Sequence, residues 1–256
     1  MSPSRAGKRG RERDSDDVVA GRNPVVEALR AAVPARALYV VDGGDDRVAE
    51  AVRLARSGGV EVRRVDRPEL DRRAGGVPHQ GVLLAVRPYA YADPDDLLDH
   101  AGGAAPLVLA LDGVTDPHNL GAIVRSAAAF GGHGVVVPER RSAGVTAAAW
   151  KASAGTLSAV PVARTVNLVR QLERYQKRGV FVVGLTGAAT AELAASRLLA
   201  EPLVLVVGAE GRGLSRLVQE TCDELVCIPL APRAESLNAS VAAGVALYEV
   251  ARHRPR

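Results

Sequence analysis

The sequence has 256 residues, of which 47% are hydrophobic, 3% aromatic and 24% charged, with a net charge of +4. This apolar content supports a sizeable core and excludes a chain that is disordered throughout. The scarcity of aromatic residues argues against an RNA-binding surface of stacked Phe and Tyr rings. Because no apolar run approaches the ~20 residues of a membrane span and the start is charged, we expect a soluble, cytoplasmic protein without a signal peptide.

The first 17 residues are basic and lack hydrophobic periodicity, so we expect them to form a disordered tail. Residues 1–13 carry five Arg or Lys side chains against one Glu, an excess that equals the net charge of the whole chain. A tail of this kind suits a polyanionic partner such as RNA. Charge alone is equally consistent with a solvated tail that only aids solubility.

Predicted helices and strands alternate from residue 18 onward, which favours a small α/β domain over 18–88. In chain order we expect a helix over 23–32 with Asn23 as its N-cap, a strand over 37–41, a helix over 45–58, a strand over 60–65, a short helix, and a strand over 81–86. Residues 89–104 mix Pro, Gly and acidic residues and are predicted to be a linker, with one helical turn near Leu97.

A second run of alternating elements occupies residues 105–256. The predicted strands lie at 106–111, 134–138, 159–163, 179–185, 203–207 and 224–230, and the predicted helices at 119–130, 143–152, 166–178, from 213, and at 236–252. Since the strands are apolar on both faces and alternate with helices, they predict a mostly parallel sheet covered on both sides. Cys222 and Cys227 match neither zinc nor redox spacing, so we interpret them as ordinary buried residues and expect no metal site.

Three of these strands run into loops rich in glycine and polar residues: the first loop (112–121), the second loop (208–215) and the third loop (228–240). In α/β proteins, ligands bind beyond the carboxyl ends of the strands, where loops and helix N-termini expose backbone N–H groups. We therefore expect the three loops to meet in a single composite pocket.

Each polar residue in these loops also has a structural interpretation. Asn119 suits the N-cap of the helix that follows it, and Arg125 suits an exposed helix position. Glu210 fits a solvated turn, and either Ser236 or Asn238 fits the N-cap of the last helix. The second loop has the glycine order G-x-x-G-x-G rather than the dinucleotide fingerprint G-x-G-x-x-G, which disfavours a nucleotide-dependent oxidoreductase.

Taken together, the three loops resemble the SpoU (TrmH) family of RNA ribose 2'-O-methyltransferases, within the SPOUT superfamily. The matching motifs are N-L-G-A-I-V-R at 119–125, G-A-E-G-R-G at 208–213, I-P-L at 228–230 and S-L-N-A-S-V-A at 236–242. Two further phrases, D-G-V-T-D-P-H-N-L-G at 112–121 and V-P-H-Q-G at 77–81, resemble bacterial members that methylate a guanosine ribose in 23S ribosomal RNA. This resemblance covers residues 18–252.

The resemblance implies transfer of a methyl group from S-adenosylmethionine to a ribose 2'-hydroxyl, without a metal. It implies catalytic roles for Asn119, Arg125, Glu210, Ser236 and Asn238, and cofactor binding by main-chain groups around Gly208, Ile228, Leu230 and Leu237. In the family the arginine is sometimes assigned as the base. Because a guanidinium has a pKa above about 12, our hypothesis is that it grips the adjacent phosphate and stabilises charge on the attacking oxygen. We expect the glutamate to anchor this arginine or to accept a hydrogen bond from the nucleotide.

The resemblance also implies a fold and partners. The expected α/β fold is a trefoil-knotted SPOUT methyltransferase domain over 105–256, preceded by a small L30e-like RNA substrate-binding domain. Expected partners are 23S ribosomal RNA or a precursor large subunit, and a second copy, since the family's active site lies at a homodimer interface. In the last helix, Leu237, Val241, Val245 and Tyr248 fit dimer packing or core packing equally well.

Candidates for RNA contact in the small domain are Arg22, Asn23, His79 and Gln80, which are equally explained as turn and cap residues. Two other functions stay open. One is a 2'-O-methyltransferase for transfer RNA or another ribosomal nucleotide, and the other is a non-catalytic RNA-binding or ribosome-assembly factor on the same fold.

Overall fold

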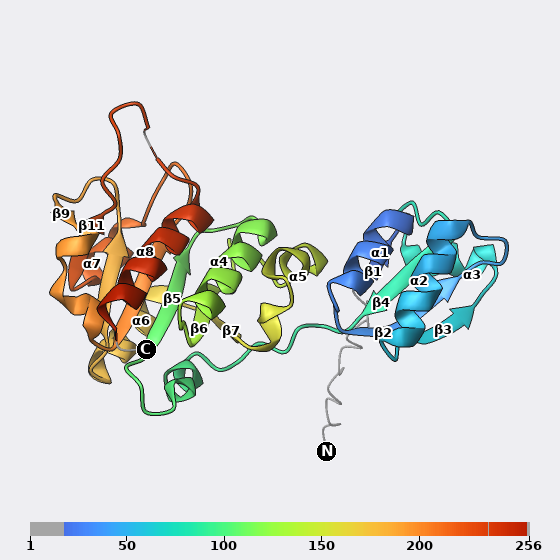
Figure 1. Ribbon diagram of the computed structural model, residues 1–256, viewed down its shortest axis with the longest axis horizontal. Coiled ribbons are helices and arrows are strands. Elements are labelled where there is room, and N and C mark those ends of the chain that lie inside the picture. Colours follow the sequence, from blue (N-terminus) through green and yellow to red (C-terminus); the bar gives the residue numbers. More distant parts are fainter. Residues whose placement is uncertain (1–17, 235, 255–256) are drawn as a thin grey trace, which may run out of the picture. The chain divides into compact units, whose positions relative to one another are not determined.

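The computed structural model of the protein describes residues 18–234 and 236–254, so the predicted basic tail, residues 1–17, lies outside the described residues. The chain divides into two compact units. The first contains residues 18–26 and 34–88, and the second contains residues 27–33 and 89–254. Most helices and strands of both units are labelled in Figure 1.

The first unit has a mixed four-stranded sheet in the order β1-β4-β2-β3, in which β2 and β3 are parallel and the other pairs are antiparallel. Its elements are β1 (Val18–Ala20), α1 (Arg22–Arg30), β2 (Ala35–Val40), α2 (Asp46–Ser57), β3 (Glu61–Arg64), α3 (Arg67–Ala74) and β4 (Val82–Val86). Every helix and strand expected in this unit is present. Strand β1 was not expected, because three residues are too few to show a hydrophobic pattern. Asn23 is not the N-cap, because Val25 N donates to Gly21 O and the helix therefore begins earlier.

The second unit has a seven-stranded sheet in the order β7-β6-β5-β10-β8-β11-β9, and every pairing between these strands is parallel. Its strands are β5 (Leu107–Asp112), β6 (Gly134–Pro138), β7 (Val162–Thr165), β8 (Phe181–Leu185), β9 (Ala191–Glu192), β10 (Leu203–Gly208) and β11 (Glu224–Cys227). The two central strands, β5 and β10, are buried along almost their whole length, as the continuous apolar runs predicted. The expected mostly parallel sheet is therefore confirmed.

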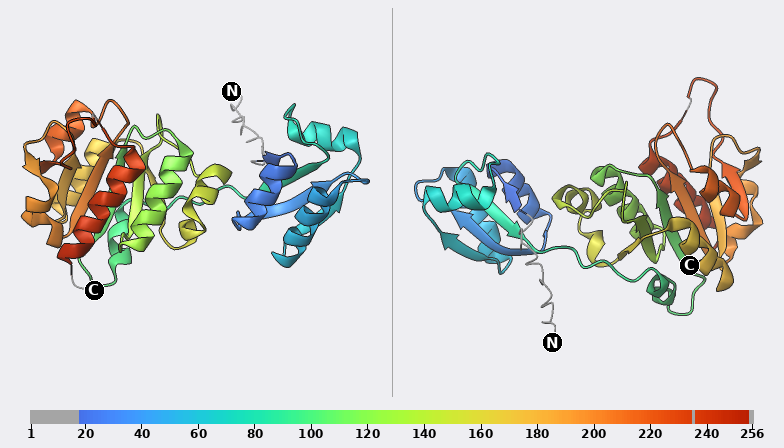
Figure 2. Two further views of the ribbon diagram at one scale, coloured as in Figure 1. Left: turned by 45° about the horizontal axis from the view of Figure 1, so that its top comes forward. Right: turned by 180° about the vertical axis from the view of Figure 1, so that it is seen from behind.

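Helices cover both faces of this sheet. They are α4 (Pro117–Ala129), α5 (Ala147–Ser153), α6 (Leu168–Lys177), α7 (Arg216–Thr221) and α8 (Ala239–His253), with short 3-10 turns η1 (Asp95–Ala101), η2 (Thr156–Ser158), η3 (Leu193–Ala195) and η4 (Arg197–Ala200). Alternate strand residues such as Val108 and Val204 pack with α6 and α7 in one buried cluster. On the opposite face α4 and α8 lie side by side, as Figures 1 and 2 both show.

Several boundaries differ from the sequence expectations. The helix expected over 143–152 begins only at Ala147, because the backbone before it bonds elsewhere: Ala143 N donates to Val114 O at 2.8 Å and Val145 N to the Tyr91 hydroxyl at 2.9 Å. Likewise the last helix begins at Ala239 rather than at residue 236. Tertiary hydrogen bonds of this kind are invisible to hydrophobic periodicity.

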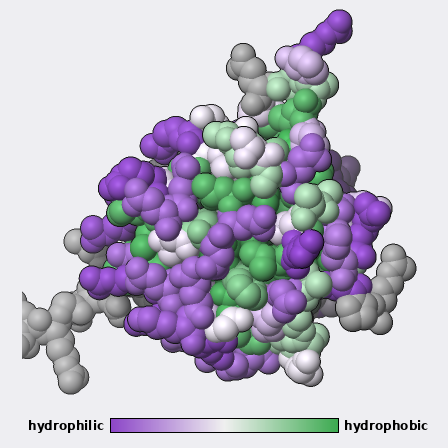
Figure 3. All heavy atoms as spheres, turned by 90° about the vertical axis from the view of Figure 1, so that its left-hand side faces the viewer, coloured by the Kyte–Doolittle hydropathy of each residue, from purple (hydrophilic) through white to green (hydrophobic). Residues whose placement is uncertain are grey.

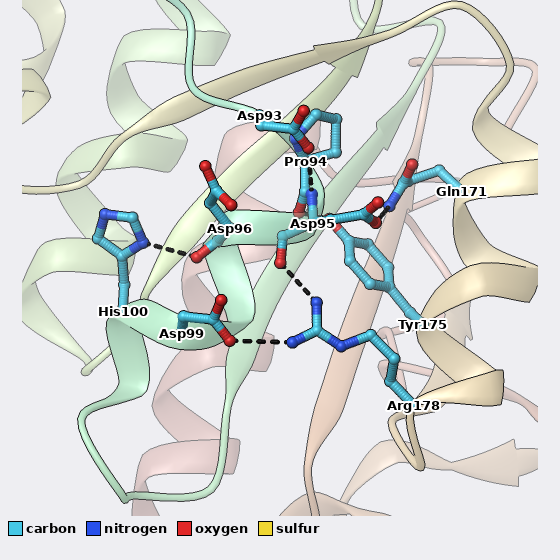
Figure 4. A network of polar contacts seen from close by, with 9 residues as sticks. All are labelled: Asp93, Pro94, Asp95, Asp96, Asp99, His100, Gln171, Tyr175 and Arg178. Atoms are coloured by element: carbon cyan, nitrogen blue, oxygen red, sulfur yellow. Dashed lines mark hydrogen bonds and ion pairs between the residues drawn. The ribbon is translucent and has the colours of Figure 1, made fainter.

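The segment that was predicted as a linker is fixed to the second unit. Figure 4 shows three side chains of α6 and its C-terminal end, Gln171, Tyr175 and Arg178, pointing toward η1. Arg178 donates to Asp95 O at 2.6 Å and to Asp99 Oδ1 at 2.9 Å, and the Tyr175 hydroxyl donates to the carbonyl of Pro94 at 2.6 Å. The η1 leucines are buried in the same core cluster. Residues 89–104 therefore belong structurally with the sheet that follows them.

Both cysteines are free and half-buried rather than fully buried. Burial raises the pKa of the Cys222 thiol to about 12, so this group is an inert packing residue at neutral pH. None of the described helices is long and apolar enough to cross a membrane.

Candidate active site

The three loops lie at one edge of the seven-stranded sheet, because the strands that precede them are parallel and end on the same side. The first and second loops follow β5 and β10, which are paired neighbours. They are joined directly by Asp112, whose Oδ2 accepts a hydrogen bond from Ser215 N at 2.6 Å. Sequence reasoning missed this link, although an acid at the end of an apolar strand is a signal for it.

A network of side-chain hydrogen bonds joins all three loops. Glu210 Oε1 accepts from Asn119 Nδ2 at 2.7 Å, from Asn238 Nδ2 at 2.6 Å and from Ala239 N at 3.4 Å. Asn238 Nδ2 also donates to Asn119 Oδ1 at 3.1 Å. Residues separated by up to 119 positions thus meet at a single carboxylate. We call Asn119, Glu210 and Asn238 the three-loop network.

The capping interpretations are resolved by the same contacts. Asp116, not Asn119, is the N-cap of α4, since its Oδ1 accepts from His118 N at 2.9 Å. The asparagine side chain is therefore free to join the network. Asn238 has both roles, because its Oδ1 caps α8 by accepting from Ser240 N at 2.9 Å while its Nδ2 bonds to Glu210.

A cavity of about 310 Å³ opens beside the three-loop network, between the second and third loops and the end of β8. We call it the loop cavity. Its lining residues are Leu185, Thr186, Gly187, Val207, Gly208, Ala209, Glu210, Gly211, Arg212, Gly213, Ile228, Leu230, Ser236, Leu237, Ala239 and Ala242. All four residues expected around the cofactor are in this set, and so are Glu210 and Ser236. Much of the remaining wall is glycine and alanine, so main-chain groups form a large part of it.

The close approach of the two ends of the second loop requires glycine at position 208. A Cβ on Gly208 would lie 2.2 Å from the carbonyl carbon of Gly213, which is backbone and cannot turn aside. The loop is closed by a hydrogen bond from Gly213 N to Ala209 O at 2.8 Å, and the φ of Gly213 is +64°. The motif glycines therefore shape the wall of the loop cavity.

Arg125 stands apart from these residues. It is exposed on α4, does not line the loop cavity, and has no hydrogen bond or ion pair with any residue in 18–234 or 236–254. Six residues along a helix correspond to a rise of about 9 Å and a rotation of roughly 240° from Asn119, so the two side chains face different directions. The expected anchoring of Arg125 by Glu210 is absent, since Glu210 holds the two asparagines instead.

The candidate RNA-contact residues of the first unit mostly form a turn. His79 is 6% exposed; its Nε2 contacts Asp71 Oδ1 at 2.8 Å and its Nδ1 accepts from Gly81 N at 3.0 Å, so both ring nitrogens are engaged. Arg22 Nε donates to Gln80 O at 3.1 Å, and Arg22 N donates to Gln80 Oε1 at 3.2 Å.

Asn23 is exposed, at the start of α1. His79 is therefore well explained as a buried turn residue. Asn23 remains accessible to a partner.

No group of three His, Cys, Asp or Glu side chains in the described part of the chain is arranged to hold a metal ion. The polar groups that do meet, in the three-loop network, are a single carboxylate and two amides. This set of groups can position and hydrogen-bond a polar substrate. It offers hydrogen-bond donors and acceptors rather than a charged catalytic pair.

Comparisons with known proteins agree with this geometry. The SpoU rRNA Methylase family matches residues 106–248, and a family described as RNA 2'-O ribose methyltransferase substrate binding matches residues 18–92. An uncharacterized tRNA/rRNA methyltransferase of Mycobacterium avium (strain 104) is 54% identical over 255 residues, which are 98% of this chain and 81% of that protein. The corresponding protein of Mycolicibacterium gilvum is 56% identical over 251 residues, 96% of this chain and 80% of that protein.

Solved structures show the same fold over nearly the whole chain. The SpoU methyltransferase AviRb from Streptomyces viridochromogenes, in complex with AdoMet, superposes with a TM-score of 0.67 at 27% identity, covering 96% of this chain and 93% of AviRb. An AdoMet-bound rRNA methyltransferase from Sinorhizobium meliloti has a TM-score of 0.62 at 27% identity, covering 92% and 87%. The family matches span both units, and the motif residues converge in space. The chain belongs to the SpoU methylase family.

Proposed function

We propose that this protein transfers a methyl group from S-adenosylmethionine to a ribose 2'-hydroxyl of RNA, and that its target is a guanosine in 23S ribosomal RNA. The observation that carries the proposal is the three-loop network beside a cavity lined by the motif glycines. The alternative target, a ribose of transfer RNA or another ribosomal nucleotide, uses the same site. We propose a cytoplasmic location for this reaction.

The loop cavity fits S-adenosylmethionine in size and chemistry. Its volume of about 310 Å³ is within the range of small-molecule sites. Ile228, Leu230 and Leu237 offer an apolar wall for an adenine ring, and the tight turn at Gly208 lets backbone N–H and C=O groups approach the ligand. When bound, S-adenosylmethionine supplies an electrophilic methyl group on a sulfonium centre.

The protein's own residues must position a weak nucleophile and favour the charge that develops on it. Glu210 and Asn238 hold the second and third loops together, and we propose that Ser236 and Asn119 orient the ribose at the mouth of the cavity. We propose that Arg125 binds the adjacent phosphate and the attacking oxygen through its planar guanidinium. The proton then leaves late, to water.

The position of Arg125 outside the loop cavity supports a homodimer. Since Arg125 is exposed and does not line the cavity of its own chain, we propose that Arg125 of a second copy completes the site. The last helix offers a surface for that copy: Val241 and Val245 are 50% and 42% exposed, so packing within one subunit does not explain them. Tyr248 contacts Phe130 edge-on and is still 53% exposed. Figure 3 shows a different face of the second unit, the one with α7, β9 and β11. On that face, hydrophobic patches are bordered by hydrophilic residues. We also propose the family's trefoil knot at the third loop.

We propose that the first unit, residues 18–88, is an L30e-like domain that presents RNA to a catalytic domain over 105–256. Its match to an RNA 2'-O ribose methyltransferase substrate-binding family supports this role. Recognition then depends on phosphate charge and RNA shape, because the whole chain contains only five Tyr, two Phe and one Trp.

Ribose-methylation mapping of total RNA, with and without the gene, tests the function and the target together. Loss of one 2'-O-methyl mark at a guanosine of 23S ribosomal RNA is expected. Loss of a mark in transfer RNA would select the alternative target. An unchanged map would favour a non-catalytic RNA-binding factor, which calorimetry would identify by its failure to bind S-adenosylmethionine.

The role of Arg125 is tested by Arg125→Lys in the same cells. A lysine keeps the charge but loses the planar fork, so the mark should be strongly reduced. Methylation at the wild-type level would show that the fork is dispensable and would overturn the proposed role.

A further inference from the structure

A second hollow, of about 670 Å³, lies on the other side of the second loop from the loop cavity. It is formed at the carboxyl ends of β5, β6, β7 and β10, and it shares Ala209, Arg212 and Gly213 with the loop cavity. Its lining residues are Asp112, Gly113, Pro138, Glu139, Arg140, Arg141, Val166, Ala209, Arg212, Gly213, Leu214 and Ser215. We call it the arginine hollow. None of the family motifs accounts for Arg140 or Arg141.

The three arginines of the hollow are exposed, and their guanidinium groups do not hold the fold together through hydrogen bonds or ion pairs in the described part of the chain. Within residues 18–234 and 236–254, Arg140, Arg141 and Arg212 have no hydrogen-bond or ion-pair partner for their guanidinium groups. Two carboxylates face the same space. Asp112 is engaged with Ser215 N, while Glu139 is exposed and opposes an anionic ligand. The positive charges still outnumber the negative ones, and on an exposed edge they attract a polyanion.

The loop that carries Arg140 and Arg141 is held in place although it is exposed. Glu139 N donates to Thr165 O at 2.9 Å, the Ser142 hydroxyl donates to Pro138 O, and Ala143 N donates to Val114 O. Arg141 has a φ of +58°, a left-handed conformation that a residue other than glycine rarely adopts without support. The turn is thus fixed by hydrogen bonds, while its two guanidinium groups are exposed and unpaired among the described residues. This combination favours ligand binding over a role in packing.

The hollow also has an apolar rim. Val166, which directly follows β7, is 84% exposed, the largest exposed fraction among the large hydrophobic residues that the structure describes. A valine beside guanidinium groups suits a nucleotide, because a ribose or base offers an apolar face next to a charged phosphate.

We infer that the arginine hollow binds the sugar-phosphate backbone of the RNA strand that flanks the methylated ribose. Arg140 and Arg141 hold phosphates, Val166 contacts a sugar or base, and Arg212 stands between this strand and the loop cavity. The inference rests on the proposed function for its choice of ligand. It assigns to the hollow a subsite for RNA whose Arg140 and Arg141 lie outside the family motifs.

The test uses the full-length protein and a fluorescein-labelled single-stranded RNA of mixed sequence, with binding followed by anisotropy over a range of salt concentrations. The variant is Arg140→Ala/Arg141→Ala, and the matched control is Arg197→Ala, an exposed arginine of η4 at the opposite edge of the sheet. Arg212 is left unchanged because it borders both cavities. Binding of S-adenosylhomocysteine, measured by calorimetry, reports on the integrity of the loop cavity.

We expect the double variant to bind the RNA about 10-fold more weakly or worse, with unchanged affinity for S-adenosylhomocysteine. The slope of log affinity against log salt should fall by roughly 0.7 for each lost phosphate contact. Glu139→Gln removes the opposing charge and should tighten RNA binding by about 2-fold or more.

RNA affinity and salt slope equal to those of Arg197→Ala would overturn the inference. If the double variant also loses S-adenosylhomocysteine binding, Glu139→Gln decides, since RNA affinity unchanged in that variant contradicts the subsite. A wild-type protein that binds RNA through the hollow but methylates none would refute the proposed function and leave the hollow intact.

Discussion

Replacement of Glu210 by alanine is the sharpest single test of how the loops are held together. Its carboxylate accepts short hydrogen bonds from Asn119 and Asn238, at 2.7 and 2.6 Å, and these are direct ties between the second loop and the other two. A sheltered bond to a charged group contributes about 1.5–3 kcal/mol. Because the carboxylate is exposed, about 1 kcal/mol for each short bond is a more realistic value, or about 2 kcal/mol in all.

If the loop arrangement that binds the cofactor is destabilised by about 2 kcal/mol relative to other loop arrangements, a smaller fraction of the protein can bind. The apparent affinity for the cofactor then falls by up to ~30-fold. The assay is isothermal calorimetry with S-adenosylhomocysteine on Glu210→Ala and on the milder Glu210→Gln, which keeps an acceptor oxygen and should lose about half as much free energy. Glu220→Ala is the matched control, since Glu220 is exposed and, within residues 18–234 and 236–254, pairs only with Arg216 on its own helix. Equal affinities of Glu210→Ala and Glu220→Ala would refute the reasoning.

Four further substitutions or conditions are informative. Gly208→Ala should weaken cofactor binding at least about 10-fold by calorimetry, because its Cβ collides with backbone of the second loop. Arg254→Ala should lower the free energy of unfolding in urea by about 2–3 kcal/mol, since this half-buried guanidinium donates to four backbone carbonyls of other segments. Val245→Asp should yield a monomer by sedimentation and abolish methylation. Burial, and next the nearby Arg254 charge, lower the pKa of His133, so unfolding free energy should fall as pH drops below about 6.5.

Two of these predictions have a control variant, and the other two have an outcome that would contradict them. Arg252→Ala should change stability by less than about 0.5 kcal/mol, because Arg252 is exposed and, among the described residues, pairs only with Glu249 of its own helix. His133→Gln should flatten the pH dependence of stability; an unchanged slope between pH 7.5 and 5.5 would assign it to other groups, by the linkage relation. A dimeric Val245→Asp protein, or Gly208→Ala with wild-type affinity, would contradict the corresponding interpretation.

The sheet could be predicted because its strands are simple. Runs such as 107–111 and 203–207 are apolar at every position, which is typical of a short strand covered on both faces, and their alternation with helical segments favours a strand over a buried helix. The convergence of the three loops also followed from the strands, since parallel neighbours end at the same edge. The family motifs indicated Asn119, Glu210 and Asn238 within those loops, and the structure brings these three side chains together.

The sequence could not predict which residues distant in the chain contact one another in the fold. Tyr91 reads as part of a linker, yet its hydroxyl accepts from Val145 N and delays the start of α5. Arg125 is identified by its spacing from Asn119, but the same spacing separates the directions of the two side chains by roughly 240°, and Arg125 does not line the cavity. Arg140 and Arg141 look like an ordinary polar loop until the fold places them beside the second loop.

The most direct test of the proposed reaction uses purified protein, S-adenosylmethionine with an isotopically labelled methyl group, and 23S ribosomal RNA. The RNA is digested to nucleosides and analysed by mass spectrometry. The proposal predicts label in a single 2'-O-methylguanosine, lost with Glu210→Ala and retained with Glu220→Ala. Label on a base, or none in either ribosomal or transfer RNA while the cofactor binds, would contradict it.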